Sequence, residues 1–151
     1  MGRGFSVAED SAVPCPCGSG QRYAVCCAPL HQGLVMADTA EQLMRSRYSA
    51  FAKGEVDYLI KTHLDREHSP ARQRRDLRAH CRQTRWLELR IQAVEGGGSG
   101  DLTGCVRFEA DFKESGQHRI LKEASLFKRC GDRIEGDWLY LRPLSLELVH
   151  A

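Results

Sequence analysis

The hydrophobic periodicity of this 151-residue chain changes near residue 84, and that change limits the folds open to it. Before this point apolar residues recur at spacings of three and four, as on one face of a helix; after it they alternate with polar residues, as in a half-buried strand. No internal repeat and no alternation of strands with helices is present. Helices followed by strands joined through turns predict an α+β domain, with helices packed on one face of a curved antiparallel sheet.

Capping residues set the expected limits of three helices. A capping box, in which the side chains of Thr39 and Gln42 each bond the other's backbone amide, predicts a helix that ends at Gly54. A short helix is expected over about 55–63, and a third over 69–83, where Ser-Pro supplies an N-cap and a first helical proline. The third helix has few apolar residues, so we expect it at the surface.

Four strands with intervening turns account for the rest of the chain. In the first, WLELRIQAV, the residues Leu87, Leu89, Ile91 and Ala93 are expected to face the core. The second, LTGCVRFEADF, alternates from Leu102 to Phe112, and GGGSGD forms the flexible connection between the two. The remaining strands are RILKEASLFKR and WLYLRPL.

Composition indicates a soluble globular protein, with 42% hydrophobic and 28% charged residues and a net charge of +2. No apolar run approaches the ~20 residues of a membrane helix. The first residues, MGRGFSVAED, are too short and polar for a signal peptide, so we expect a cytoplasmic protein that does not enter membranes. We expect a flexible N-terminus over 1–12, a cysteine-rich knuckle over 13–33 and the main domain over 34–151.

Four of the seven cysteines lie close together, in the pattern C-x-C-x8-C-C formed by Cys15, Cys17, Cys26 and Cys27. Clustered cysteines in a reducing compartment bind metal more often than they pair. A disulfide between adjacent residues would be strained, because their Cα atoms are ~3.8 Å apart and disulfides span 4.4–6.8 Å. Tetrahedral Zn²⁺ needs only that each sulfur reach ~2.3 Å from one centre, and four such ligands make a closed structural site.

Three other interpretations of this segment stay open at the sequence level. His31, four residues after Cys27, could take the place of one thiolate. The cysteines could hold an iron–sulfur cluster, or they could be free reduced thiols. One structural Zn²⁺ is the interpretation that we favour.

The segment CPCGSGQRYAVCC closely resembles the SEC-C motif, a short zinc-binding element also found at the C-terminus of the preprotein-translocase motor SecA. The resemblance implies that the four cysteines are the ligands. The stretch from His31 to Thr62, with LMRSRYSAF as its most specific part, is similar to the YchJ-like family of uncharacterised bacterial proteins. That similarity, extended more loosely by WLELRI, EASLF and DWLYL, implies an NTF2-like cone of helices against a curved sheet.

Such a cone could enclose a ligand pocket. The polar residues that could line it are Arg45, Arg47, Tyr48, Tyr58, His63, Glu109 and Glu123. The alternative is structural: Tyr48 lies on the apolar helix face, and the arginines could pair with Glu41 or with acids on the strands. We find no catalytic dyad, so a non-catalytic role is favoured over an enzymatic one.

An arginine-rich stretch from 66 to 90 carries eight arginines against three acids. It could contact phosphates or nucleic acid. The helix within it, 69–83, is usually a solvated surface, and no Phe, Tyr or Trp is interleaved there for base stacking.

The function that we favour from the sequence is that of a zinc-binding adaptor. SEC-C motifs in translocation motors are implicated in chaperone and ribosome contact, so the resemblance implies a protein or ribosome partner, with Gln21, Arg22 and Tyr23 presenting the surface. Pocket ligand binding or catalysis, and nucleic-acid binding through 66–90, are the alternatives. The fold would also permit a homodimer through the sheet.

Overall fold

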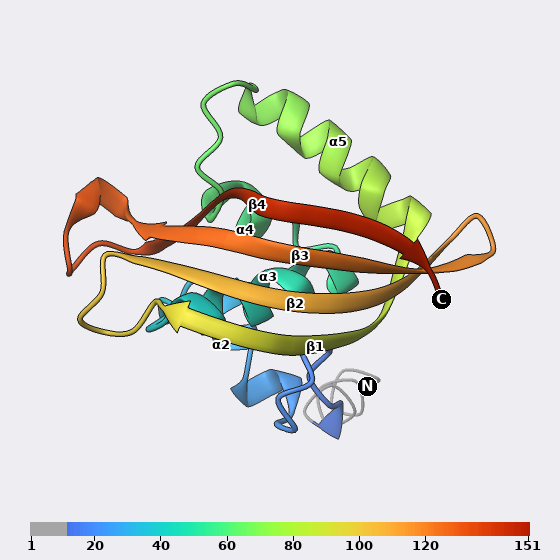
Figure 1. Ribbon diagram of the computed structural model, residues 1–151, viewed down its shortest axis with the longest axis horizontal. Coiled ribbons are helices and arrows are strands. Elements are labelled where there is room, and N and C mark those ends of the chain that lie inside the picture. Colours follow the sequence, from blue (N-terminus) through green and yellow to red (C-terminus); the bar gives the residue numbers. More distant parts are fainter. Residues whose placement is uncertain (1–11) are drawn as a thin grey trace, which may run out of the picture.

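The computed structural model describes residues 12–151, so the predicted flexible segment 1–12 lies almost wholly outside the described residues. Its main body is a four-stranded antiparallel sheet in the order β1-β2-β3-β4, with helices behind it (Figure 1). The elements in chain order are η1 (Tyr23–Val25), α2 (Ala28–His31), α3 (Ala40–Lys53), α4 (Val56–Lys61), α5 (Pro70–Gln83), β1 (Thr84–Gly96), β2 (Thr103–Glu114), β3 (Gln117–Arg129), η2 (Cys130–Asp132) and β4 (Trp138–His150). The predicted α+β arrangement is confirmed.

The helix boundaries follow from side-chain caps. The Thr39 hydroxyl accepts from the Gln42 amide at 3.1 Å, as predicted, but the Gln42 side chain accepts from the amide of Asp38 at 2.7 Å and not from that of Thr39. Gly54 ends α3 in the left-handed conformation, at φ 75°. Ser69 caps α5 as predicted, whereas α4 is shorter than the expected 55–63.

Strand β1 departs from the predicted alternation. Its pairing with β2 shifts register between Trp86 and Glu88 and again between Ile91 and Ala93. The first irregularity brings Trp86 against the core, and Leu87, which we expected inside, is 39% exposed. An extra residue in one strand reverses the side on which the following side chains lie, and local alternation cannot predict it.

Strand β2 follows its predicted pattern over most of its length. Val106, Phe108, Ala110 and Phe112 are buried, as expected, while Leu102 is exposed and precedes the strand. β4 continues to His150, well beyond the predicted segment.

The core lies between α3 and the sheet face turned toward it. Its buried members come from α2, α3, α4 and all four strands and include Leu43, Leu59, Val106, Phe127 and Trp138, each almost fully buried. Helix α5 contributes only the partly buried Leu77. The knuckle, residues 13–33, lies beside β1 (Figure 1). Its cysteines form a separate small cluster, and Leu30 near its end packs into the main core. Within residues 12–151, no helix combines the length and apolarity needed to cross a bilayer.

Candidate functional site

Four cysteine sulfurs meet inside the knuckle. The Sγ atoms of Cys15, Cys17, Cys26 and Cys27 all lie within 4.8 Å of one another, and only Cys26 is more than slightly exposed. Tight turns bring the two pairs together: Gly18 and Gly20 adopt φ values of 76° and 86°, which residues with a side chain rarely adopt. The backbone closes the loop with a bond from the Cys15 amide to the Gln21 carbonyl at 2.9 Å.

The spacing of these sulfurs fits a tetrahedral ion. Metal–sulfur bonds of ~2.3 Å place the corners of a tetrahedron about 3.8 Å apart. The Cys17–Cys26 and Cys26–Cys27 sulfur separations are 3.7 and 3.9 Å. The four cysteines together could therefore hold one metal ion, with every coordination position filled by the chain.

The thiols also interact with one another. Hydrogen bonds from Cys17 and Cys27 lower the pKa of Cys15, and the bond to Cys15 is the main cause that raises the pKa of Cys27. Desolvation raises the pKa of Cys26 to about 11. Because the pKa values of Cys26 and Cys27 are raised while that of Cys15 is lowered, the four thiols do not ionise together unless a cation neutralises their charge.

His31 is engaged away from the sulfurs. Its Nε2 lies 2.8 Å from the Ser46 carbonyl, which can only accept, so Nε2 carries the proton. Its Nδ1 therefore accepts from the Tyr23 hydroxyl at 2.7 Å. Burial lowers the pKa of His31, which favours this neutral form. The ring packs between Tyr23 and Tyr58, so His31 attaches the knuckle to the main domain, with no ring nitrogen left for a metal.

The knuckle docks on one face of α3. Ser49 Oγ lies 3.4 Å from Cys15 Sγ, and Arg45 donates to the Cys17 carbonyl at 2.7 Å. The Lys53 ammonium lies 4.1 Å from the centre of the Tyr23 ring. Ser46 and Ser49 are fully buried, and their small side chains let the two segments approach closely.

Replacing His31 by alanine should weaken docking without releasing the metal. Two hydrogen bonds are lost, to the Tyr23 hydroxyl and to the Ser46 carbonyl, so we expect a loss of about 1–3 kcal/mol in unfolding free energy. Tyr23→Phe, which removes one bond, should cost about 0.5–1.5 kcal/mol. Urea unfolding measures both, beside metal content by elemental mass spectrometry. Loss of the metal from His31→Ala would contradict this role and make His31 a ligand.

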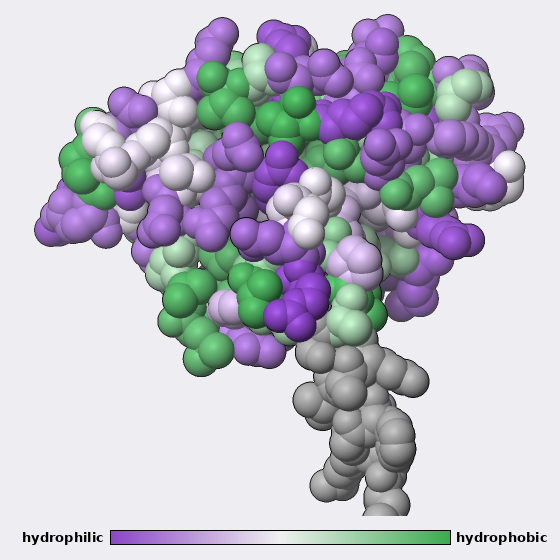
Figure 2. Space-filling model, turned by 90° about the horizontal axis from the view of Figure 1, so that it is seen from below, coloured by the Kyte–Doolittle hydropathy of each residue, from purple (hydrophilic) through white to green (hydrophobic). Residues whose placement is uncertain are grey.

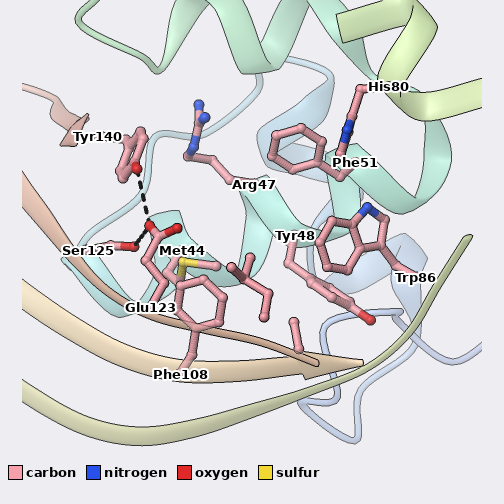
Figure 3. Close-up of a pocket in the computed structure, with 12 residues that line it drawn as sticks. Met44, Arg47, Tyr48, Phe51, His80, Trp86, Phe108, Glu123, Ser125 and Tyr140 are labelled. Carbon is pink, nitrogen blue, oxygen red and sulfur yellow. Dashed lines mark hydrogen bonds between the residues drawn. The ribbon is translucent and has the colours of Figure 1, made fainter. Parts of the chain in front are cut away.

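A cavity of about 190 Å³ lies between α3, α5 and the sheet (Figure 3). Of the residues expected to line a pocket, it brings together Arg47, Tyr48 and Glu123. Sequence reasoning did not find Trp86, Ser125 or Tyr140, which come from strands whose irregularities decide which side chains face inward.

The other expected lining residues lie elsewhere. Arg45 is held by Glu41, at 3.0 Å, and by the knuckle. The Tyr58 hydroxyl bonds to Ser46 at 2.7 Å, and His63 borders a different surface hollow. Glu109 lies on the other face of the sheet, with Arg90 and Lys122.

Two opposite charges are buried at one end of the cavity. Glu123 Oε2 accepts from the Ser125 hydroxyl and, at 3.1 Å, from the Tyr140 hydroxyl. Burial raises the pKa of Glu123, and the charge of Arg47 offsets this in part. Desolvation lowers the pKa of Arg47 to about 10, so the guanidinium stays charged at neutral pH.

Glu123→Gln should change how stability depends on pH. A carboxyl group whose pKa is raised in the folded chain binds its proton more tightly there than in the unfolded chain. The stability that this proton contributes is therefore complete below pH 4.5, the ordinary pKa of the group, and is lost as pH rises from 4.5 through the raised pKa. The wild-type chain should therefore lose stability relative to Glu123→Gln between pH 4.5 and the raised value. Urea unfolding across this range measures the difference, and parallel profiles would contradict the raised pKa.

The arginine-rich stretch does not form one surface. Arg74, Arg75, Arg78 and Arg82 border a shallow hollow on α5, where Arg74 pairs with Asp57 at 2.9 Å. Arg90 lies on the sheet among acids, including Asp111.

Comparison with known proteins identifies the parts of the chain. Residues 13–29 match the SEC-C motif, and residues 39–143 match the model described as YchJ, middle NTF2-like domain. The second match covers well over half of the chain. The chain belongs to the YchJ family.

Relatives of this YchJ-family chain extend over most of its length. A UPF0225 protein of Corynebacterium efficiens is 40% identical over 131 residues, covering 87% of this chain and 92% of the relative. The solution structure of a SEC-C motif-containing protein of Rhodopseudomonas palustris has 31% identity and a TM-score of 0.71, covering 88% of this chain and 98% of that one. A crystal structure of such a protein from Psychrobacter arcticus has 30% identity and a TM-score of 0.72, covering 90% and 84%.

The YchJ-like segment LMRSRYSAF lies within α3 and serves both sites. Arg45, Ser46 and Ser49 contact the knuckle. Arg47 and Tyr48, on another face of the helix, line the cavity. One helix therefore positions the cysteine cluster on one side and the cavity on the other.

Proposed function

We propose that this YchJ-family chain is a zinc-stabilised, non-catalytic interaction module. The observation that carries the proposal is the group of four cysteine sulfurs at tetrahedral spacing. Zn²⁺ bound by Cys15, Cys17, Cys26 and Cys27 would have no open position for water or substrate, which is typical of a structural site. The ion would supply folding free energy to a segment whose own apolar cluster is small.

The charge and donor set favour zinc among the metals. Four thiolates are soft ligands, which suit Zn²⁺, and within residues 12–151 no carboxylate or imidazole joins the group. Four thiolates on Zn²⁺ leave two negative charges. Arg45, bonded to the Cys17 carbonyl, offsets part of this charge from α3.

The knuckle and the loop after it would present the binding surface. Gln21 and Arg22 are exposed, and so are the apolar side chains of Val25, Leu34, Val35 and Met36. Figure 2 shows apolar residues gathered at the lower left of the face in view, next to hydrophilic ones. We expected Tyr23 on this surface, but the structure leaves it half-buried, with its hydroxyl bonded to His31.

The partner that this surface fits is a protein. Exposed apolar side chains beside charged ones are typical of protein-binding sites, whereas α5, where the arginines gather, lies elsewhere on the chain. A protein of the ribosome and a chaperone are the two partner classes that the SEC-C motif favours.

Charge reversal at Arg22 separates binding from metal retention. We expect the Arg22→Glu chain to bind the protein that the wild-type chain captures about tenfold more weakly. An unfavourable charge in an interface costs more than about 1.4 kcal/mol of binding free energy, which corresponds to that factor. Zinc content should stay at one ion per chain. Arg78→Glu, at an exposed arginine of α5, is the matched control and should capture normally. Equal capture by all three chains, with mass spectrometry identifying the bound proteins, would contradict the proposed surface.

A further inference from the structure

The cavity between the helices and the sheet has the walls of a binding site for a flat ring. Aromatic side chains surround it: Tyr48, Phe51, Trp86, Phe108 and Tyr140. They come from α3, β1, β2 and β4, and so enclose the space from several sides (Figure 3). Its volume of about 190 Å³ is below the ~300–1,000 Å³ of pockets for drug-sized ligands, so it suits a molecule with one ring.

Arg47 has hydrogen-bonding capacity that the chain does not use. It is 6% exposed, and Nη1 donates to the Leu59 carbonyl at 2.9 Å and to the Thr62 hydroxyl at 2.7 Å. Within residues 12–151, Nε and Nη2 donate to no acceptor. The guanidinium also lies 4.9 Å from the centre of the Tyr140 ring, which fixes its position.

Glu123 has the complementary capacity. It is 9% exposed, and both of its hydrogen bonds, from Ser125 and Tyr140, go to Oε2. Oε1 accepts from no group in the described part of the chain. Arg47 and Glu123 form no ion pair with each other, although the cavity borders both. Buried charges are costly unless they are paired or hydrogen-bonded, so this arrangement favours a group that bonds both.

The opposite side of the cavity is aromatic. Figure 3 places Arg47, Glu123 and Tyr140 on one side of the space and Trp86, Phe51 and His80 on the other. Trp86 Nε1 is fully buried and out of reach of a ligand atom, so Trp86 offers the cavity its ring. A ligand could therefore be bonded at one end by the two charges while its ring lies against the indole at the other.

We propose that this cavity binds a neutral, planar, single-ring molecule that carries a donor and an acceptor side by side, as an aromatic carboxamide or a lactam does. Its N–H donates to Glu123 Oε1 and its carbonyl accepts from Arg47. Because the charges of Arg47 and Glu123 cancel, the site favours a neutral edge over an anion or a cation. This inference is independent of the metal-dependent role proposed above.

Benzamide is the probe for this class, with benzoate and benzylamine as charged analogues of the same size. The zinc-loaded full chain is titrated and followed through its backbone and indole ¹H–¹⁵N resonances. We expect benzamide to shift the Trp86 indole resonance and those of residues around the cavity. Benzoate and benzylamine should bind at least about tenfold more weakly, the ratio that 1.4 kcal/mol produces.

Two variants locate the binding. Ala110→Leu fills the cavity from β2 and should abolish the shifts. Trp86→Phe shortens the aromatic wall against which the ring of the ligand lies, and should weaken binding severalfold if the chain stays folded, which the backbone spectrum reports. No shift with millimolar benzamide, equal binding of benzoate, or unchanged binding in Ala110→Leu would each overturn the proposal.

Discussion

Cys26→Ser is expected to abolish metal binding, with one zinc ion per chain in the wild-type protein and none in the variant. Serine places a neutral, hard hydroxyl where the cluster presents a sulfur 3.7 Å from Cys17 and 3.9 Å from Cys27. Structural zinc contributes about 10–16 kcal/mol of apparent binding free energy, and the knuckle has few apolar contacts to replace it. We therefore expect the cysteine loop, residues 13–27, to unfold and the main domain, whose core includes Leu30 but none of the cysteines, to stay folded.

Elemental mass spectrometry measures the zinc, and protease digestion detects an unfolded knuckle. Cys130→Ser is the matched control, because Cys130 is an exposed free cysteine outside the cluster. It should keep one zinc ion and resist the protease. Zinc retained by Cys26→Ser, or its absence from the wild-type chain, would contradict the proposed centre.

The second large effect is expected at Arg47. Arg47→Met removes the buried guanidinium, leaves the Leu59 carbonyl and the Thr62 hydroxyl without their donor, and leaves Glu123 with no opposing charge. Each buried acceptor left unsatisfied costs about 1–3 kcal/mol, so for the two we expect a loss of about 2–6 kcal/mol. The measurement is the free energy of unfolding in urea, followed by tryptophan fluorescence.

Two further variants test the cause of this loss. Arg74→Met removes the exposed pair with Asp57 and should cost less than about 1 kcal/mol. Adding Glu123→Gln to Arg47→Met should recover part of the stability, because no uncompensated carboxylate remains. Two results would mean that the buried charges of Arg47 and Glu123 do not interact. One is a loss of unfolding free energy in Arg47→Met as small as that in Arg74→Met; the other is a double variant whose loss equals the sum of those of Arg47→Met and Glu123→Gln.

Much of the fold could be predicted from local sequence because its signals are local. Side-chain caps at Thr39 and Ser69 begin α3 and α5, and Gly54 ends α3. The alternation from Val106 to Phe112 predicted which side chains of β2 are buried. The cysteine spacing indicated a common centre, since a short loop with two turning glycines has few ways to separate its sulfurs.

The cavity could be predicted only in part, because its lining depends on strand register and on helix orientation. Arg45 and Arg47 flank the same apolar stripe of α3. Only the docking of the knuckle on this helix decides that Arg45 contacts the knuckle and Arg47 lines the cavity. The irregularity in β1 turns Trp86 inward and Leu87 outward. Tertiary pairing sets these directions, and no local pattern encodes them.

X-ray absorption at the zinc edge of the purified chain tests the central claim most directly. The account predicts one shell of four sulfur atoms at ~2.3 Å, with no nitrogen or oxygen ligand. A shell of three sulfurs and one nitrogen at ~2.0–2.1 Å would contradict it and give His31 the place of one cysteine. An iron signal in place of zinc, or no bound metal, would contradict the zinc-stabilised knuckle itself.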